Sequence, residues 1–291
     1  MRARMLAPLL LAGGAALLYG VGAAHAAVRD VPTETSSNWA GYAVTDNGTA
    51  AATGAAPTTF SNVSGNWTQP KAACTIGNQT YSAFWVGLGG FSDGSQALEQ
   101  IGTEANCSAT GKPSYSVWYE LVPAAPVTIK LKLAAGDQFS ASVGVTGTTV
   151  ALRIANLTRG TVFTKSLQMA SPDLTSAEWI AEAPSSCSGY GGCRPLPLTN
   201  FGTALFTASS VTGNGHLGTI SDPAWAASAV TLQGTSGGLY RGRFASTLPA
   251  ANATPGPLSS DGSSFSVAWS QTTSSSGGSS PSPGGRWWPG G

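Results

Sequence analysis

Short stretches in which apolar and polar residues alternate limit this chain to a narrow range of folds. The alternation is clear in four stretches with Gly-containing turn sequences among them: residues 127–133, 139–143, 149–156 and 161–168. A period of two residues buries one face of a β-strand and leaves the other face in water. The helical period is absent apart from a short turn near residues 221–227. Short strands at regular spacing predict an all-β antiparallel sandwich.

The two ends of the chain have the composition of processing and linker segments. Met-Arg-Ala-Arg is followed by an apolar run over residues 5–21 and by Ala24-His25-Ala26, the pattern of a secretory signal peptide. We expect cleavage after Ala26, and a membrane anchor is the alternative. Residues 272–291 contain 15 Gly, Ser or Pro and predict a flexible tail. The sequence therefore predicts a signal peptide at 1–26 and one domain at 27–271 in a secreted, extracellular protein.

Charged side chains are scarce in this chain. They make up 9% of it, against about 25% in ordinary globular proteins, and the formal net charge is +1. Nucleic-acid binding needs a basic surface that neutralises phosphates, so this balance argues against that partner class. The hydrophobic content of 42% is sufficient for a core. No stretch after the leader has the length that a membrane span needs, so we expect no membrane contact after signal removal.

Four cysteines are expected to meet an oxidising compartment after export. They are Cys74, Cys107, Cys187 and Cys193, which allow three pairings. The pairing of Cys74 with Cys107 and of Cys187 with Cys193 closes two local loops, and we expect that one. Metal binding is the alternative, but there is no C-x-x-C spacing and the chain has only two histidines. We therefore expect neither a metal nor a cofactor.

Carboxyl groups gather in segments that read as strands. Five of the 13 acidic residues fall there: Glu99, Glu104, Glu120, Glu178 and Glu182. Strand alternation puts Gln100 and Glu104 on one face of their strand, and Trp118 and Glu120 on one face of theirs. Glu178, Ile180 and Glu182 likewise share a face of a third strand. If those faces coincide, one sheet surface carries several carboxyls whose mutual repulsion raises some of their pKa values. Such groups are candidate acids and bases, whereas each glutamate alone would be an ordinary solvated strand residue.

Six short motifs occur in a particular order along the chain. They are Ser37-Asn38-Trp39-Ala40-Gly41, Trp85-Val86-Gly87-Leu88, Leu98-Glu99-Gln100-Ile101-Gly102-Thr103-Glu104, Trp118-Tyr119-Glu120, Ala177-Glu178-Trp179-Ile180-Ala181-Glu182 and Asn200-Phe201-Gly202-Thr203. Their order and spacing over about residues 36–212 resemble the glutamic peptidases, also called eqolisins. The resemblance implies a double-sheet β-sandwich, a concanavalin-like jelly roll, whose concave sheet binds the substrate.

The resemblance also implies the residues of the site. The family's catalytic Gln and Glu correspond to Gln100 and Glu182, with Glu178 as the fallback for the Glu. Residues that line or support the family's site correspond to Trp85, Glu104, Trp118 and Glu120. A carboxylate can take a proton from water and return it to the leaving amine, while an amide can donate to the oxyanion. Because an ordinary glutamate has a pKa near about 4.3, we expect an acid endopeptidase that acts on extended protein segments.

One motif departs from the family pattern, and two other functions stay open. Gly89 stands where the family has an aspartate, so one supporting carboxyl is missing. A non-catalytic binding module could use some of the nine tryptophans to stack on sugars. A glycoside hydrolase could use Glu178 and Glu182, although residues four apart on a strand are about 13 Å apart, too far for a retaining pair. We expect protein or peptide substrates and a monomer.

Overall fold

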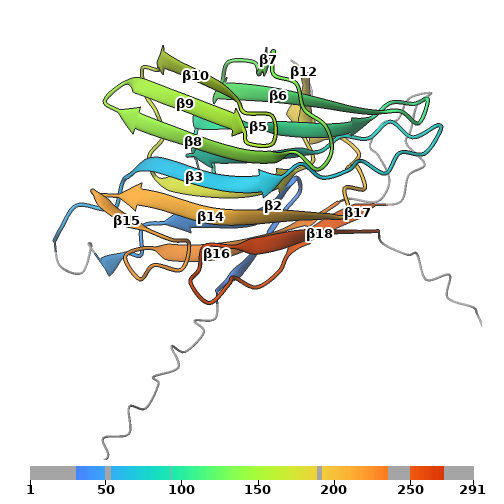
Figure 1. Cartoon of the computed structure of the whole chain (residues 1–291). Helices are drawn as coiled ribbons and strands as arrows, with labels where there is room; N and C mark the ends of the chain where they lie inside the picture. Colours follow the sequence, from blue (N-terminus) through green and yellow to red (C-terminus); the bar gives the residue numbers. More distant parts are fainter. Residues whose placement is uncertain (1–30, 50–53, 93, 189–191, 235–249, 272–291) are drawn as a thin grey trace, which may run out of the picture. The chain divides into compact units, whose positions relative to one another are not determined.

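The part of the chain that the structure describes is built from β-strands (Figure 1). The computed structural model describes residues 31–49, 54–92, 94–188, 192–234 and 250–271. The expected signal peptide at 1–26 and tail at 272–291 lie outside these residues and stay predictions. The strands are β1 (Thr33–Ser36), β2 (Trp39–Thr45), β3 (Phe60–Thr68), β4 (Ala83–Leu88), β5 (Leu98–Cys107), β6 (Pro113–Val122), β7 (Val127–Ile129), β8 (Gln138–Thr146), β9 (Thr149–Asn156), β10 (Thr161–Gln168), β11 (Ser176–Glu182), β12 (Ser185–Ser188), β13 (Gly192–Pro195), β14 (Thr203–Gly213), β15 (His216–Gly218), β16 (Ala226–Gln233), β17 (Ala251–Pro255) and β18 (Phe265–Gln271).

Hydrogen bonds join nearly all these strands into one continuous sheet (Figure 1). Its order is β10-β9-β8-β3-β14-β18-β17-β16-β2-β11-β4-β5-β6-β7, with β1 beside β16 and β15 beside β14. Only β1 pairs in parallel within it, and β12 and β13 form a separate hairpin. Strands β3, β8 and β9 pack on β4, β5 and β11, so the sheet folds over into two layers. The predicted antiparallel sandwich is confirmed, and its layers are parts of one sheet.

Large side chains from both layers fill the space between them. The fully buried ones include Trp67, Phe84, Phe139, Trp179 and Phe206. The Trp67 indole N–H donates to Thr103 Oγ1 at 2.9 Å. The Trp179 indole N–H donates to the carbonyl of Ser64 at 2.7 Å. Both buried indoles therefore find acceptors across the interlayer space, which removes the cost of burying an unpaired donor.

The alternating stretches form strands as predicted, with one exception. Residues 149–156 and 161–168 are β9 and β10, and residues 139–143 lie within β8. The predicted strand at 127–133 is wrong beyond Ile129, where β7 ends. The N–H of Leu131 donates to the carbonyl of Ile129 two residues back, which turns the backbone away from the sheet.

Strands β11, β4, β5 and β6 lie side by side and set the register of the polar residues. Glu182 pairs with Ala83, and Ala83 pairs with Glu104 on the next strand. Gln100 pairs with Glu120 on the strand after that. Directly paired residues point to the same face of a sheet. The predicted faces therefore coincide for these four polar side chains.

Gly102 makes room for two tryptophans on this face. It pairs with Trp85 on one side and with Trp118 on the other. A Cβ atom at residue 102 would lie 2.6 Å from the Cβ of Trp85 and 2.4 Å from the carbonyl oxygen of Phe84. Only glycine avoids this overlap, so the glycine of this motif is a packing requirement of the strand.

Both expected disulfides are formed. Cys74 and Cys107 link the segment after β3 to the end of β5, across 33 positions of sequence. Cys187 and Cys193 close the β12–β13 hairpin, across 6 positions. Within the described ranges, the structure contains no helix with the length and apolar character that crossing a membrane requires.

Candidate active site

A cleft of about 420 Å³ opens over strands β5, β6 and β11. Five of the predicted site residues line it: Gln100, Glu104, Trp118, Glu120 and Glu182. One wall is the loop at residues 123–126 between β6 and β7. The other wall is formed by Pro184, Ser185 and Cys187, where the chain enters the β12–β13 hairpin. The cleft is thus bounded by two connections that the strand pattern alone does not place together.

Glu182 is held at the end of β11 by two hydrogen-bond donors. The Trp85 indole N–H donates to Oε2 at 2.7 Å, and Asn38 Nδ2 donates to Oε1 at 3.2 Å. The pKa of Glu182 is raised to about 7, chiefly by burial and also by the nearby charge of Glu120, while the two donors act in the opposite direction. The carboxyl therefore gains and loses its proton near neutrality rather than near the ordinary value.

Gln100 and Glu120 form a pair across β5 and β6. Gln100 Nε2 donates to Glu120 Oε2 at 2.7 Å, which fixes the orientation of the amide. Burial raises the pKa of Glu120, and the hydrogen bond from Gln100 lowers it in part. Gln100 is 4% exposed, and its Oε1 atom has no hydrogen-bond partner. An unpaired buried acceptor that lines a cleft is a position where a water or a substrate donor would bind.

Trp118 and Glu104 complete the polar lining. Trp118 is 6% exposed, and its indole N–H has no hydrogen-bond partner. Glu104 Oε2 accepts from Ser116 Oγ at 2.6 Å and from Asn106 Nδ2 at 3.0 Å. The cleft therefore offers an unused donor and an unused acceptor beside carboxyls that are already oriented.

Glu178 does not line the cleft. It is fully buried on β11, and neither carboxyl oxygen has a hydrogen-bond partner. Burial raises the pKa of Glu178 well above its ordinary value, and the charges of Asp173 and Glu99 add to the shift. Glu99 is also fully buried, and burial is the main cause that raises its pKa to about 8. Glu178 shares the sheet face of Gln100, because both residues pair with Gly87, but it is not among the residues that line the cleft. The pair Glu178 and Glu182 of the glycoside-hydrolase alternative therefore does not meet in the cleft.

Asp173 lies where a side chain at Gly89 would point. A Cβ atom at residue 89 would lie 2.5 Å from the Cβ of Asp173, and Gly89 has a φ of +80°. Ser95 Oγ and the N–H of Gly90 donate to Asp173 Oδ2, and Thr175 donates to Oδ1. Burial alone would raise the pKa of Asp173, but these hydrogen bonds outweigh it and hold the pKa below its ordinary value. The sequence predicts that a supporting carboxyl is missing at residue 89. In the structure, the carboxyl of Asp173, from the segment before β11, occupies the space beside that residue.

Sequence reasoning did not single out Asn38 or the two walls of the cleft. Asn38 belongs to the first motif, but its role depends on β2 pairing with β11, which brings it to Glu182. The sequence offers a signal for the second wall, because Cys187 and Cys193 are close enough to define a small loop. Within the described ranges, no group of three or more His, Cys, Asp or Glu residues is arranged to hold a metal ion.

Comparison with known families agrees with this geometry. A sequence model described as the Peptidase A4 family matches residues 37–239, well over half of the chain. The chain belongs to the Peptidase A4 family. All six motifs lie inside the matched region, and membership makes this protein a glutamic-type endopeptidase.

Solved structures of such peptidases share the fold of this Peptidase A4 member. Scytalido-glutamic peptidase with a transition-state analogue inhibitor is similar with a TM-score of 0.60 and 23% identity, over 80% of this chain and 98% of that chain. SCP-B, an eqolisin-family member in complex with the tripeptide Ala-Ile-His, is similar with a TM-score of 0.51 and 21% identity, over 81% and 98%. At 21–23% identity, the likeness to these structures shows a shared fold. No curated protein matches the chain in a sequence search.

Proposed function

We propose that this Peptidase A4 member hydrolyses extended polypeptides with Glu182 as the general base and Gln100 as the oxyanion donor. One observation carries the proposal. The unpaired Oε1 atom of Gln100 and the oriented carboxyl of Glu182 line the same cleft. A water that binds between them would meet an acceptor on one side and a base on the other.

The reaction needs no group beyond those in the cleft. Glu182 as carboxylate takes a proton from the bound water, and the resulting hydroxide attacks the peptide carbonyl carbon. The amide N–H of Gln100 donates to the developing oxyanion, and the orphan indole N–H of Trp118 is a further donor in the same cleft. Protonated Glu182 then returns its proton to the leaving amine nitrogen as the C–N bond breaks.

The pKa of Glu182 alters the expected pH dependence. The expectation of an acid enzyme assumes an ordinary carboxyl, whereas burial raises the pKa of Glu182 to about 7. A general base works only in its ionised form, and half of the Glu182 carboxyls are ionised when the pH reaches that value. We therefore expect the hydrolysis rate to rise from strong acid to neutrality, with the midpoint of the rise near pH 7.

We also propose that the mature enzyme acts outside the cell. Its leader at 1–26 has the pattern of a secretory signal, and both disulfides suit an oxidising compartment. Protein or peptide segments are the proposed substrates, and a monomer is the proposed state.

Hydrolysis of denatured casein tests the proposal directly. We would compare the wild type with Gln100→Ala, Glu182→Gln and Glu178→Gln from pH 3 to pH 8, with circular dichroism to verify folding. We expect losses of about 10²–10⁴-fold for Glu182→Gln and about 10²–10³-fold for Gln100→Ala. Glu178→Gln is the matched control on the same strand and should keep its activity at weakly acid pH. Activity lost in Glu178→Gln but kept in Glu182→Gln would move the base to Glu178 and overturn the assignment.

A further inference from the structure

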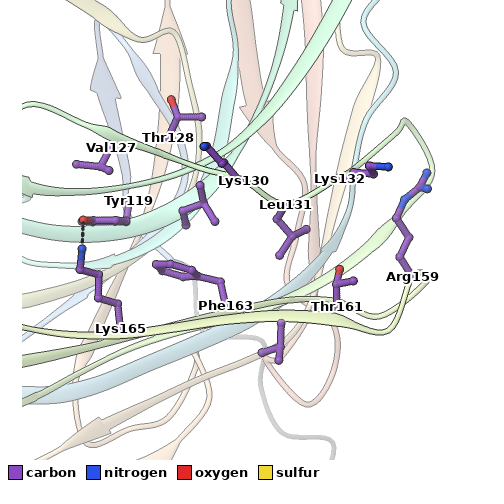
Figure 2. Close-up of a pocket in the computed structure, with 12 residues that line it drawn as sticks. Tyr119, Val127, Thr128, Lys130, Leu131, Lys132, Arg159, Thr161, Phe163 and Lys165 are labelled. Atoms are coloured by element: carbon purple, nitrogen blue, oxygen red, sulfur yellow. Dashed lines mark hydrogen bonds between the residues drawn. The ribbon is translucent and has the colours of Figure 1, made fainter.

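A second groove, of about 790 Å³, lies between the two strands at the ends of the sheet, β7 and β10 (Figure 2). Residues 127–132 line one side, and β10 with Arg159 lines the other. Tyr119 of β6 lies between them, and its neighbours Trp118 and Glu120 line the catalytic cleft. Because successive side chains of a strand point to opposite faces, the groove lies on the other face of β6 from that cleft.

The groove is basic in a chain that has few charges. Four of the 14 lysines and arginines line it: Lys130, Lys132, Arg159 and Lys165. No carboxyl is among the lining residues, although Arg159 is paired with Asp137 behind it. Lys165 Nζ donates to the hydroxyl of Tyr119 at 3.0 Å and lies 5.3 Å from the ring centroid, which holds it at the groove. Such a concentration of positive charge favours an acidic ligand.

The groove also presents apolar side chains to solvent. Val127 is 44% exposed and Val162 is 59% exposed, and Leu131 and Phe163 also line the groove. Figure 2 shows the Phe163 ring directed toward Tyr119, with Leu131 on its other side, and the two aromatic rings are stacked with their centroids 6.1 Å apart. Apolar surface of this kind is favourable to cover, at about 25 cal/mol per Å² removed from water. A purely ionic ligand would leave it uncovered.

Both strands that border the groove have a free edge. β10 pairs only with β9 and β7 pairs only with β6 among the described strands. A free strand edge presents unpaired backbone N–H and C=O groups to which an extended peptide can add as a further strand. In such a strand alternate side chains point to opposite sides, so acidic and apolar residues in alternation would meet the lysines and the apolar lining.

We propose that this groove binds an extended segment of another polypeptide in which acidic and apolar side chains alternate. The chain's own segments outside the described ranges contain only two acidic residues, Asp30 and Asp93, so they lack the charge to fill it. A second copy that docked groove to groove would bring the same lysines together. The occupant is therefore a different polypeptide, and its binding does not depend on the proposed hydrolysis.

The groove and the catalytic cleft share one connecting segment. Residues 123–126 form a wall of the cleft, and residues 127–132 continue directly into the groove. A polypeptide held in the groove is thereby tethered close to the cleft, which raises the local concentration of any neighbouring part of the same polypeptide.

Fluorescence anisotropy with a labelled peptide of alternating Glu and Val tests the proposal. The protein is the full chain carrying Glu182→Gln, so that the peptide is not cleaved. We expect binding that weakens about tenfold or more when Lys130, Lys132 and Lys165 are all changed to Gln, and that weakens with added salt. The matched control changes Lys71 and Lys112 to Gln outside the groove and should bind as before. Melting temperatures verify that each variant folds.

Two further probes distinguish strand addition from simple charge attraction. The same peptide with N-methyl groups on alternate residues lacks the donors of one strand edge, so we expect it to bind at least tenfold more weakly. Equal binding of the N-methylated peptide would overturn the proposed strand addition. Polygalacturonate that displaces the peptide as well as unlabelled peptide does would assign the groove to an anionic polysaccharide instead. Absence of peptide binding by the parent protein would overturn the proposal altogether.

Discussion

Glu182 and Glu178 lie four residues apart on the same strand, and their surroundings give them different chemistry. Glu182 ends β11 at the open cleft, where Trp85 and Asn38 donate to both of its oxygens. Glu178 lies in the strand interior with no partner for either oxygen. A buried carboxylate without donors is too costly to keep, so Glu178 is held as the neutral acid. Burial raises the pKa of both carboxyls, and the two donors at Glu182 limit the rise there.

Replacing Glu120 with glutamine should move the acid limb of the pH–rate profile to lower pH. The charge of Glu120 contributes to the raised pKa of Glu182, and glutamine removes that charge while keeping an acceptor for Gln100. We expect a shift of up to about one pH unit, which corresponds to about 1.4 kcal/mol. The measurement is kcat/KM against pH for Glu120→Gln, with the exposed carboxyl change Glu34→Gln as the control. An unchanged limb would show that Glu120 does not influence the titrating group.

Replacing Trp85 with phenylalanine should move the same limb in the opposite direction. The indole N–H of Trp85 donates to Glu182 at 2.7 Å and stabilises its charged form. A hydrogen bond to a charged group contributes about 1.5–3 kcal/mol, so its loss raises the pKa by about one unit or more. Trp179→Phe removes a buried indole donor that bonds Ser64 instead, and it serves as the control for lost stability. A limb that shifts equally in both variants would contradict the assigned role of Trp85.

One disulfide closes the β12–β13 hairpin and the other ties the segment before β4 to the end of β5, and the two have different consequences. The Cys187–Cys193 bridge lies beside the cleft, since Cys187 lines it. The Cys74–Cys107 bridge joins the end of β5 to the segment that precedes β4. A cross-link stabilises a fold in proportion to the chain entropy that it removes from the unfolded state, and a longer loop removes more.

Removal of each disulfide should therefore separate stability from substrate binding. Changing Cys74 and Cys107 to alanine should cost about 4 kcal/mol of unfolding free energy, and the same change at Cys187 and Cys193 about 2.5 kcal/mol. The second pair should also raise KM several-fold, because the hairpin is a wall of the cleft. Urea unfolding and steady-state kinetics measure the two effects. A larger rise in KM for the first pair would contradict the assignment of the wall.

Among the described residues, four carboxyls have pKa values that are raised in the folded state. They are Glu99, at about 8, Glu120, Glu178, and Glu182, at about 7. A raised folded-state pKa means that the folded chain binds more protons than the unfolded chain between about pH 4.5 and the folded value. Unfolding free energy therefore falls as the pH rises through that window. Activity is expected to rise with pH over much of the same range. Low pH therefore limits the activity, and high pH limits the stability.

The melting temperature should accordingly be higher at pH 4.5 than at pH 8. Glu178→Gln keeps the shape of the neutral acid and removes its ionisation, so the variant should lose less stability on going to pH 8 than the wild type loses. Glu34→Gln alters an exposed carboxyl and should follow the wild type. Differential scanning calorimetry at several pH values measures the slopes. A wild-type melting temperature that rises from pH 4.5 to pH 8 would contradict the raised pKa values.

Much of the architecture could be predicted from local pattern. Alternation is a property of each strand, so β9 and β10 could be bounded from sequence, and the small loops between cysteines indicated the disulfide pairing. The end of β7 could not be predicted in this way. The sequence alternates as far as residue 133, but the N–H of Leu131 donates to the carbonyl of Ile129 and ends the strand there. The site residues Gln100, Glu120 and Glu182 could be nominated, since polar residues stand out on strands that are otherwise apolar.

The sequence alone determined which residues are polar on which strand faces, because side-chain direction follows from the two-residue period. Only the tertiary structure decided which of those faces meet. Pairing of β11 with β2 and β4 brought Asn38 and Trp85 to Glu182, and packing buried Glu178 outside the cleft lining although it shares the sheet face of Gln100. The pKa of a carboxyl depends on donors, charges and solvent exclusion contributed by distant segments, and those exist only once the strands have come together.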